Sequence, residues 1–237
     1  MCGRYVLTDT GELQTRFDIA TTGGGPEVAA RYNIAPTQTL PVVTRHSPNR
    51  LEAMRWGLIP SWAKDASIGS RLINARAETV AEKPSFRNAL RARRCLVPAS
   101  GFYEWKRHGT RKIPQYITLP DAPLFAFAGL WEQWRSPEGE TVRSYTIITT
   151  EPNDLMATIH NRMPVILPRE IEDDWLNGEI TDAGYLQSLL RPYPADAMTA
   201  YAVSPAVSSP ARDTPDLIRP TAEVEIPGSE TRFGNSA

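Results

Sequence analysis

The sequence of 237 residues contains only two cysteines, Cys2 and Cys95, and no apolar run long enough to cross a membrane. Two cysteines are too few for a disulfide framework, which indicates a reducing compartment such as the cytoplasm. The N-terminus also lacks a basic stretch followed by an apolar segment, so it does not match a secretory signal. We therefore predict a cytoplasmic protein that makes no membrane contact.

Motifs for metals and nucleotide cofactors are missing as well. Cys2, Cys95 and His160 do not have the spacing of zinc ligands, and the chain contains neither a paired CxxC nor an HExxH motif. No Walker A or dinucleotide-binding glycine pattern occurs, and the glycine-rich stretch 21–26 is interpreted as a flexible loop. We expect no metal and no cofactor.

Charge is nearly balanced overall but unevenly distributed along the chain. The net charge is −1, yet residues 71–112 hold eleven Lys and Arg against three acids, and residues 170–237 hold twelve acids against four arginines. A basic segment of this kind is typical of a surface that binds a polyanion. The alternative is that its arginines pair with the acidic C-terminal third, and charge alone leaves both interpretations open.

Short apolar segments separated by turn residues predict an α+β fold with a mainly antiparallel, curled or barrel-like sheet and peripheral helices. The expected strands are 4–7, 40–44, 51–58, 94–97, 102–107, 113–119, 124–131 and 141–149. The expected helices follow Thr8 and cover 84–92, 153–159, 170–176 and 183–190. We expect one domain over 1–222, a flexible tail over 223–237, and a monomer.

The first chemical candidate is Cys2, which follows the initiator methionine. Because its side chain is small, we expect Met1 to be removed, which leaves a free α-amine and a thiol on adjacent carbons. The amine titrates near pH ~8 and the thiol near ~8.5, so both are partly available at neutral pH. Such a pair condenses with an aldehyde to an imine and then closes a thiazolidine. A plain start codon followed by a small residue is the alternative.

Further polar residues stand in apolar or glycine-rich surroundings. Asn74 follows an apolar run, where its amide needs hydrogen-bond partners, unless it caps a turn. Glu104 lies between aromatic residues on a predicted strand, and it suits proton transfer if it faces inward but is an ordinary charge if it faces outward. His160 ends a predicted helix, which favours its protonated form, or it is a structural histidine. Arg76 clamps a phosphate or pairs with an acid.

Six segments of the chain combine these residues with aromatic, proline and glycine positions. They are Met1–Tyr5, Arg31–Pro36, Trp56–Trp62, Leu72–Thr79, Gly101–Trp105 and Ile159–Pro164. In this order they resemble the motifs of the SOS response-associated peptidase (SRAP) family. The resemblance runs from residue 2 to about residue 221, which makes it far more specific than any one motif. The segment 203–213 resembles the family's C-terminal motif, but Ser208 stands where asparagine is common.

The resemblance implies a protein that shields abasic sites in single-stranded DNA by a covalent crosslink. It implies that mature Cys2 attacks the ring-opened aldehyde and that Asn74 orients this N-terminal residue. It assigns proton transfer to Glu104, and sugar-ring opening and imine chemistry to His160. Carboxylate and imidazole groups are suited to these proton transfers.

The resemblance also implies how single-stranded DNA is held. The positions that match backbone-binding residues of the family are Arg4, Arg76 and Arg162, with Arg71, Arg87 and Arg91 as further candidates. Pro36 and Trp62 correspond to apolar surfaces against which bases pack. We expect little sequence preference.

Two other functions remain open at this point. One is a peptidase or self-processing hydrolase in which Cys2 is the N-terminal nucleophile and the protein releases Met1 itself. The other is a non-covalent single-strand binder in which Cys2 has no chemical role.

Overall fold

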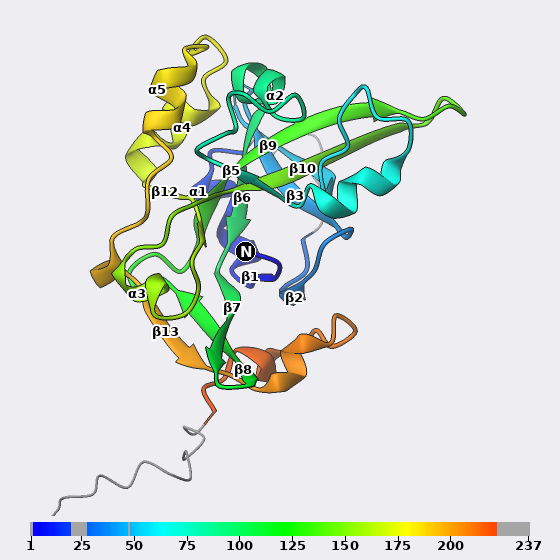
Figure 1. The fold of residues 1–237 in the computed structure, drawn as a ribbon. Coiled ribbons are helices and arrows are strands. Elements are labelled where there is room, and N and C mark those ends of the chain that lie inside the picture. The colour runs from blue at the N-terminus through cyan, green and yellow to red at the C-terminus, as the bar shows by residue number, and fades with distance from the viewer. Residues whose placement is uncertain (1, 20–27, 47, 222–237) are drawn as a thin grey trace, which may run out of the picture.

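The computed structural model describes residues 2–19, 28–46 and 48–221 (Figure 1). The expected loop at 21–26 and the expected tail at 223–237 lie outside these residues. The longer strands are β3 (Thr39–Thr44), β4 (Arg50–Trp56), β6 (Arg94–Ala99), β7 (Gly101–His108), β8 (Arg111–Thr118), β9 (Phe125–Arg135) and β10 (Thr141–Thr150). The shorter strands are β1 (Tyr5–Leu7), β2 (Arg31–Ile34), β5 (Asn74–Arg76), β11 (Met163–Pro164), β12 (Ile166–Leu167) and β13 (Thr199–Ala202). The α-helices are α1 (Leu13–Arg16), α2 (Arg87–Ala92), α3 (Asp154–Ala157), α4 (Glu172–Leu176) and α5 (Ala183–Ser188).

Five of these strands close into a barrel. Their order is β10-β4-β3-β6-β9, and β9 pairs in turn with β10. The neighbours in this ring are antiparallel except for β10 and β4, which run parallel. Short helices surround the strands (Figure 1). The predicted α+β fold with a mainly antiparallel, barrel-like core is therefore confirmed.

A second sheet joins the start of the chain to its C-terminal part. Its order is β13-β8-β7-β1-β2, with antiparallel pairing throughout. β1 lies between β7 and β2, so the residues that precede β1 emerge between these two strands. This position decides which side chains surround Cys2.

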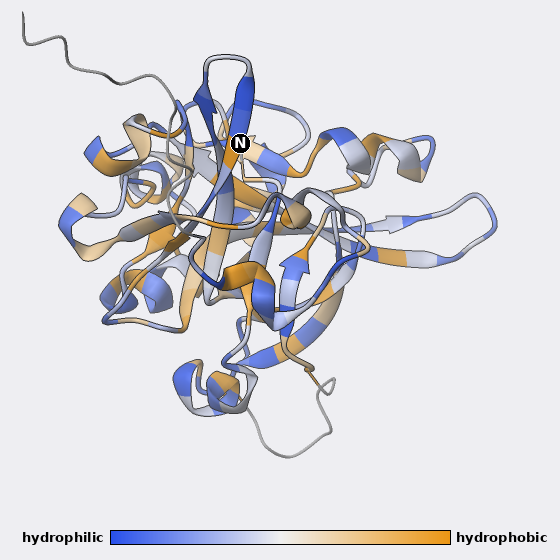
Figure 2. Cartoon of the chain, turned by 90° about the horizontal axis from the view of Figure 1, so that it is seen from below, coloured by the Kyte–Doolittle hydropathy of each residue, from blue (hydrophilic) through white to orange (hydrophobic). Residues whose placement is uncertain are grey.

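An aromatic cluster fixes β1 against the barrel. The ring of Tyr5 lies 5.2 Å from that of Trp56 and 6.0 Å from that of Phe127, both in edge-to-face contact. The hydroxyl groups of Tyr5 and Tyr145 are 2.8 Å apart, and all four side chains are buried. Rings in this geometry add stabilisation beyond their buried area. Figure 2 shows hydrophobic residues along the inner strands and hydrophilic residues at the ends of hairpins.

The sequence did not predict the short strands β2, β5 and β13, and one predicted helix begins before the observed one. β2, β5 and β13 have three or four residues each, which is too short for an alternating pattern to stand out. The turn interpretation of Asn74 was wrong, because Asn74 lies in β5 and pairs with Ile147 of β10 in parallel. Helix 84–92 was predicted too long, since α2 begins only at Arg87.

The described acids of the C-terminal third do not pair with the basic segment 71–112. They form ion pairs with the first part of the chain, as Arg16–Glu172, Arg31–Asp213 and Arg45–Asp173. Within the described ranges, no Lys or Arg of 71–112 forms an ion pair with an acid of 170–221. Within this segment Arg93 pairs with Glu132, while Lys106, Arg107, Arg111 and Lys112 form no ion pair among the described residues.

Candidate active site

Cys2 lies beside the strand that carries Glu104. The carbonyl oxygen of Arg4 accepts a hydrogen bond of 3.0 Å from the backbone amide of Tyr103, which extends the pairing of β1 with β7. Continuing this antiparallel register places Gly3 opposite Glu104. Figure 1 shows the start of the chain next to β1, with β7 and β2 close by.

Cys2 and Glu104 are both buried. Cys2 has no exposed surface and Glu104 is 3% exposed, so the inward orientation of Glu104 is the correct one. Burial raises the pKa of the Cys2 thiol above its ordinary range, and the negative charge of Glu104 raises it further. The thiol therefore stays protonated at neutral pH.

Asn74 presents an amide oxygen that the described residues leave unpaired. Its Nδ2 donates a hydrogen bond of 2.9 Å to the carbonyl oxygen of Ile73, whereas its buried Oδ1 has no hydrogen-bond partner among the residues described. A buried acceptor without a donor costs about 1–3 kcal/mol. Oδ1 of Asn74 can therefore accept a hydrogen bond from a further donor.

His160 follows α3 and is held in one tautomer. Its backbone amide donates to the carbonyl oxygen of Met156 at 2.7 Å, and its Nδ1 accepts a hydrogen bond of 3.1 Å from the backbone amide of Arg162. A ring nitrogen that accepts a hydrogen bond carries no proton. In the neutral ring this contact leaves the proton on Nε2.

Arg162 is held by protein groups. Its guanidinium donates to both carboxylate oxygens of Glu78, at 2.6 and 3.1 Å, and to the carbonyl oxygen of Thr149 at 2.6 Å. The same contact lowers the pKa of Glu78. Arg162 therefore ties the segment after α3 to the end of β10, and a phosphate that binds Arg162 must compete with Glu78.

Arg76 differs from Arg162 in that its side chain is exposed. It ends β5, where its backbone pairs with that of Thr149, and its side chain is exposed. Within the described residues its guanidinium forms no ion pair. Asn74, Arg76, His160 and Arg162 thus gather around the end of β10, and Arg76 is the cation that is open to an incoming anion.

Arg4 is organised by residues that the sequence did not single out. Its Nη1 donates to Oδ1 of Asn33 at 2.9 Å and to the carbonyl oxygen of Val207 at 2.8 Å, while its Nη2 donates to that of Ser208 at 3.2 Å. Ser208 acts through its backbone, so the identity of its side chain does not affect this contact. Desolvation lowers the pKa of Arg4.

Asn33 is the centre of this arrangement. It is fully buried, and its Nδ2 donates to the carbonyl oxygens of Val207, Ser209 and Arg212. The carboxylate of Asp213 accepts from the backbone amide of Asn33 at 2.9 Å. The segment 203–213 is thereby pinned to β2. The only sequence signal was a polar residue inside the Arg31–Pro36 motif, to which no role was assigned.

The two apolar candidates differ in position. Pro36 is half-buried just after β2, next to the segment that leads into β1. Trp62 is 58% exposed on the loop after β4, which leaves the barrel at Gly57 with a positive φ of 116°. Trp134 holds this loop, because its Nε1 donates a hydrogen bond of 2.7 Å to the carbonyl oxygen of Ala63. Among the described residues, no hydrogen bond joins the Trp62 side chain to the other candidates.

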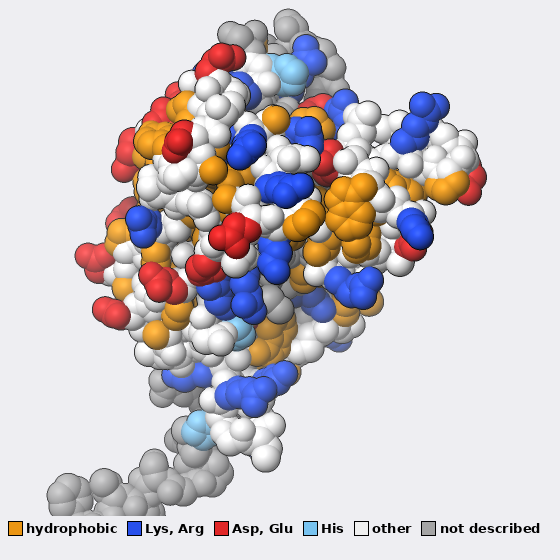
Figure 3. Space-filling model, turned by 45° about the horizontal axis from the view of Figure 1, so that its top comes forward, with side chains coloured by type: hydrophobic (Ala, Val, Ile, Leu, Met, Phe, Trp, Pro, Cys, Tyr) orange, Lys and Arg blue, Asp and Glu red, His pale blue; other side chains and the backbone are white. Residues whose placement is uncertain are grey.

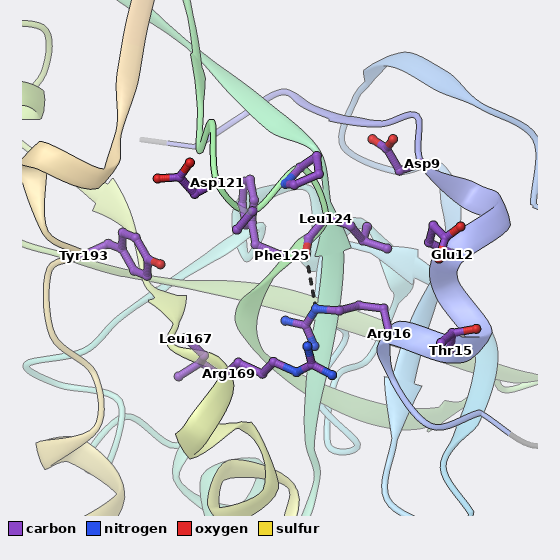
Figure 4. Close-up of a pocket in the computed structure, with 12 residues that line it drawn as sticks. Asp9, Glu12, Thr15, Arg16, Asp121, Leu124, Phe125, Leu167, Arg169 and Tyr193 are labelled. Atoms are coloured by element: carbon purple, nitrogen blue, oxygen red, sulfur yellow. Dashed lines mark hydrogen bonds between the residues drawn. The ribbon is translucent and has the colours of Figure 1, made fainter.

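The hollow drawn in Figure 4 is separate from these residues. Its volume is about 440 Å³, and it lies between α1, the turn before β9, and the segment around Arg169. Arg16 in this hollow donates to the carbonyl oxygen of Leu124 and pairs with Glu172, so it serves packing. In the described part of the chain, we find no cluster of metal-ligating side chains and no helix of sufficient length and apolarity for a bilayer.

The sequence profile described as SOS response associated peptidase (SRAP) matches residues 1–210. This chain belongs to the SRAP family. It is 52% identical over 221 residues to the abasic site processing protein YoqW of Bacillus subtilis, covering 92% of this chain and 99% of that protein. It is 33% identical over 229 residues to the abasic site processing protein HMCES of Xenopus tropicalis, covering 83% and 68% of the two chains.

Solved structures share the fold of this chain. A protein from Bacteroides thetaiotaomicron superposes with a TM-score of 0.85 at 30% identity, covering 93% of this chain and all of that one. A protein from Bordetella bronchiseptica superposes with a TM-score of 0.71 at 29% identity, covering 86% and 100%. The SRAP fold therefore extends over nearly the whole chain.

Proposed function

We propose that this protein recognises abasic sites in single-stranded DNA and crosslinks to them through Cys2 after Met1 has been removed. Relatives at 52% and 33% identity are named abasic site processing proteins. The observation that carries the proposal is the burial of Cys2 beside the buried carboxylate of Glu104. On this proposal the protein acts as a monomer on DNA in the cytoplasm, without metal or cofactor.

The raised pKa of the thiol supports a fixed order for the two nucleophiles. The α-amine of Cys2 attacks the aldehyde carbon of the ring-opened sugar, and the resulting carbinolamine loses water to form an imine. The thiol then adds to the imine carbon, and its proton passes to the nitrogen. One water leaves in total. A thiol that stays protonated is a weak nucleophile, so it attacks after the amine, when its proton can pass to the imine nitrogen.

Glu104 and Asn74 serve the amine in this scheme. Glu104 removes a proton from the α-ammonium group and returns it to the hydroxyl that leaves as water. Asn74 accepts a hydrogen bond from the amine at Oδ1, the atom that lacks a partner among the described residues. Such a contact would hold the amine in one orientation before the aldehyde arrives.

His160 opens the sugar ring. Its Nδ1 is occupied by the backbone amide of Arg162, so Nε2 carries the proton. Donation of this proton to the ring oxygen, with loss of the proton from the hydroxyl on the anomeric carbon, releases the aldehyde. The imidazole then takes part in proton transfer during imine formation.

Cations and apolar surfaces hold the strand. Arg76 is exposed and open to a phosphate, and Arg4 adds a second positive charge near the start of the chain. Arg162 contributes its charge beside the ion pair with Glu78. Pro36 and Trp62 supply surfaces for flanking bases, which are accessible in single strands but stacked inside duplexes.

The test is a denaturing gel. Purified protein is mixed with a single-stranded oligonucleotide that carries one abasic site, with Cys2→Ala as the matched variant. A shifted band for the wild type alone supports covalent chemistry through Cys2, because a non-covalent complex does not survive heat and detergent. Absence of the shift in a protein confirmed to lack Met1 refutes the crosslink.

Removal of Met1 by the protein itself is the second candidate activity. The burial of Glu104 next to Cys2 favours it, since a carboxylate there suits proton transfer at the preceding peptide bond. Intact-mass analysis of Glu104→Ala tests it. Met1 retained only in the variant supports self-processing, and Met1 absent from both proteins refutes it.

A further inference from the structure

The β7–β8 hairpin extends past Glu104 and carries a concentrated positive charge. Lys106, Arg107, Arg111 and Lys112 are all exposed, and no acid occurs from Trp105 to Pro120. Across the described ranges, none of these four side chains forms an ion pair. Their charge is therefore available to an external anion.

Strand register places two of these cations on the face of Glu104. Residues that alternate along a strand share a face, so Lys106 and His108 lie on the same side of β7 as Glu104. His108 pairs directly with Arg111 of β8, which puts Arg111 on that side too. This face of β7 therefore carries the buried carboxylate of Glu104 near the middle of the strand and basic side chains near the hairpin turn.

The other two cations lie on the opposite face. Arg107 pairs directly with Lys112, one residue out of phase with Glu104. Further in, this opposite face carries Tyr103 and Tyr116, which pack against Val203, Val207 and Leu217 in a small hydrophobic cluster. It is therefore directed toward the C-terminal segment and away from Cys2.

The distances along β7 suit a strand that leaves the reactive site. Lys106 stands about 7 Å from Glu104 along the strand, and His108 about 13 Å. Gly109 closes the hairpin with a positive φ of 58°, a conformation that favours glycine. A DNA strand with its abasic nucleotide at Glu104 would meet Lys106 and Arg111 within a few nucleotides.

We propose that the Glu104 face of the hairpin, formed by Lys106, His108 and Arg111, is a second phosphate-binding surface for the strand that flanks the abasic nucleotide. The proposal rests on the proposed function of the reactive site. The partner is the phosphodiester backbone of single-stranded DNA, bound without regard to base sequence. Figure 3 shows Lys and Arg side chains spread over one face of the molecule, with acidic side chains between them and along its left edge.

The hairpin supplies its own matched control. Lys106→Gln/Arg111→Gln removes two charges from the Glu104 face, and Arg107→Gln/Lys112→Gln removes two charges from the opposite face of the same hairpin. Binding is measured by fluorescence anisotropy on a labelled single strand that carries an unreactive tetrahydrofuran abasic analogue, over a series of salt concentrations. Oligonucleotides shortened on the 5′ or the 3′ side show which flank the hairpin holds.

We expect Lys106→Gln/Arg111→Gln to weaken binding about tenfold at low salt. The slope of log K against log salt should fall by about 1.4, which corresponds to two phosphate contacts on a single strand. The control variant should change binding less than about twofold. The loss should disappear when the oligonucleotide is shortened on one side only.

Equal effects of the two double variants, or no effect of either, would overturn the proposal. A denaturing gel with the wild type and a true abasic oligonucleotide separates this result from a failure of the reactive site. If the wild type crosslinks while Lys106→Gln/Arg111→Gln binds as tightly as the control, the hairpin surface alone is refuted. If the wild type does not crosslink, the proposed function falls, and the salt slope on an undamaged strand still tests the hairpin.

Discussion

The buried Oδ1 of Asn33 in β2 accepts a hydrogen bond of 2.9 Å from Nη1 of Arg4, the residue that precedes β1. Through its Nδ2, Asn33 also holds the carbonyl oxygens of Val207 and Ser209. One amide side chain therefore connects the start of the chain to a segment more than 170 residues away. The orientation of Arg4 depends on this connection.

Asn33→Ala should destabilise the protein by about 2–4 kcal/mol, because it leaves several buried hydrogen-bonding groups without their partner. It should also weaken binding to single-stranded DNA at temperatures where the variant is folded, since Arg4 loses its support. Urea unfolding and anisotropy measure the two effects. Asn49→Ala is the control, because Asn49 is also a buried amide, with a bond to Phe17. It should lower stability and leave DNA binding unchanged; an equal loss of binding would refute the role of Asn33.

Glu78→Gln should strengthen DNA binding by about two- to fivefold at low salt, because it removes a negative charge that competes for Arg162. Glu82→Gln makes the same charge change at an exposed residue without an ion pair among the described residues, and it should have a smaller effect. Weaker binding by Glu78→Gln would show that the ion pair itself positions Arg162 for DNA.

The same ion pair predicts a pH dependence of stability. Arg162 lowers the pKa of Glu78, so the pair stabilises the folded state above the ordinary glutamate pKa of ~4.3 and loses this contribution as the pH falls through the lowered value. Glu78 is 49% exposed, so the contribution is only about 0.5 kcal/mol. Urea unfolding of the wild type and Glu78→Gln should differ at neutral pH and converge in acid. A difference that grows in acid would contradict this sign.

Glu104→Gln should change the two reactions of Cys2 in opposite directions. Loss of the carboxylate lowers the pKa of the thiol, so alkylation of Cys2 by iodoacetamide at a fixed pH should become faster. Crosslinking to abasic DNA should become slower by about 10²- to 10⁴-fold, because proton transfer is lost. Peptide mass analysis separates Cys2 from the buried Cys95. A fall in both rates would indicate that Glu104 has only a structural role.

Alkaline conditions should unfold the protein through its buried phenols and thiols. Burial raises the pKa values of Tyr5, Tyr103 and Tyr145 above their ordinary value, as it does for Cys2 and Cys95. Groups with raised folded-state values stabilise fully below their unfolded pKa, which is ~8.5 for thiols and ~10 for phenols, and lose this as the pH rises. Urea midpoints should stay constant up to about pH 8 and then decline. Midpoints that rise with pH above about 9 would contradict this prediction.

The sequence predicted the barrel well because its strands are long and separated by clear turns. It also singled out Glu104, which the structure buries near Cys2. It could not predict the support of Arg4, because the partners of Asn33 lie far away along the chain and contribute backbone carbonyl groups. The sequence also could not show which arginines form ion pairs, because the pairing of Arg162 with Glu78 depends on tertiary contacts.

Intact-mass analysis of the wild-type protein after reaction with a single-stranded abasic oligonucleotide tests the central claim most directly. Imine formation releases one water and thiazolidine closure releases nothing further. The account predicts a product whose mass equals the protein without Met1 plus the oligonucleotide minus one water, with the crosslink mapped to Cys2 and absent from Cys2→Ala. A product that retains Met1, or a crosslink of the same yield in Cys2→Ala, would contradict it.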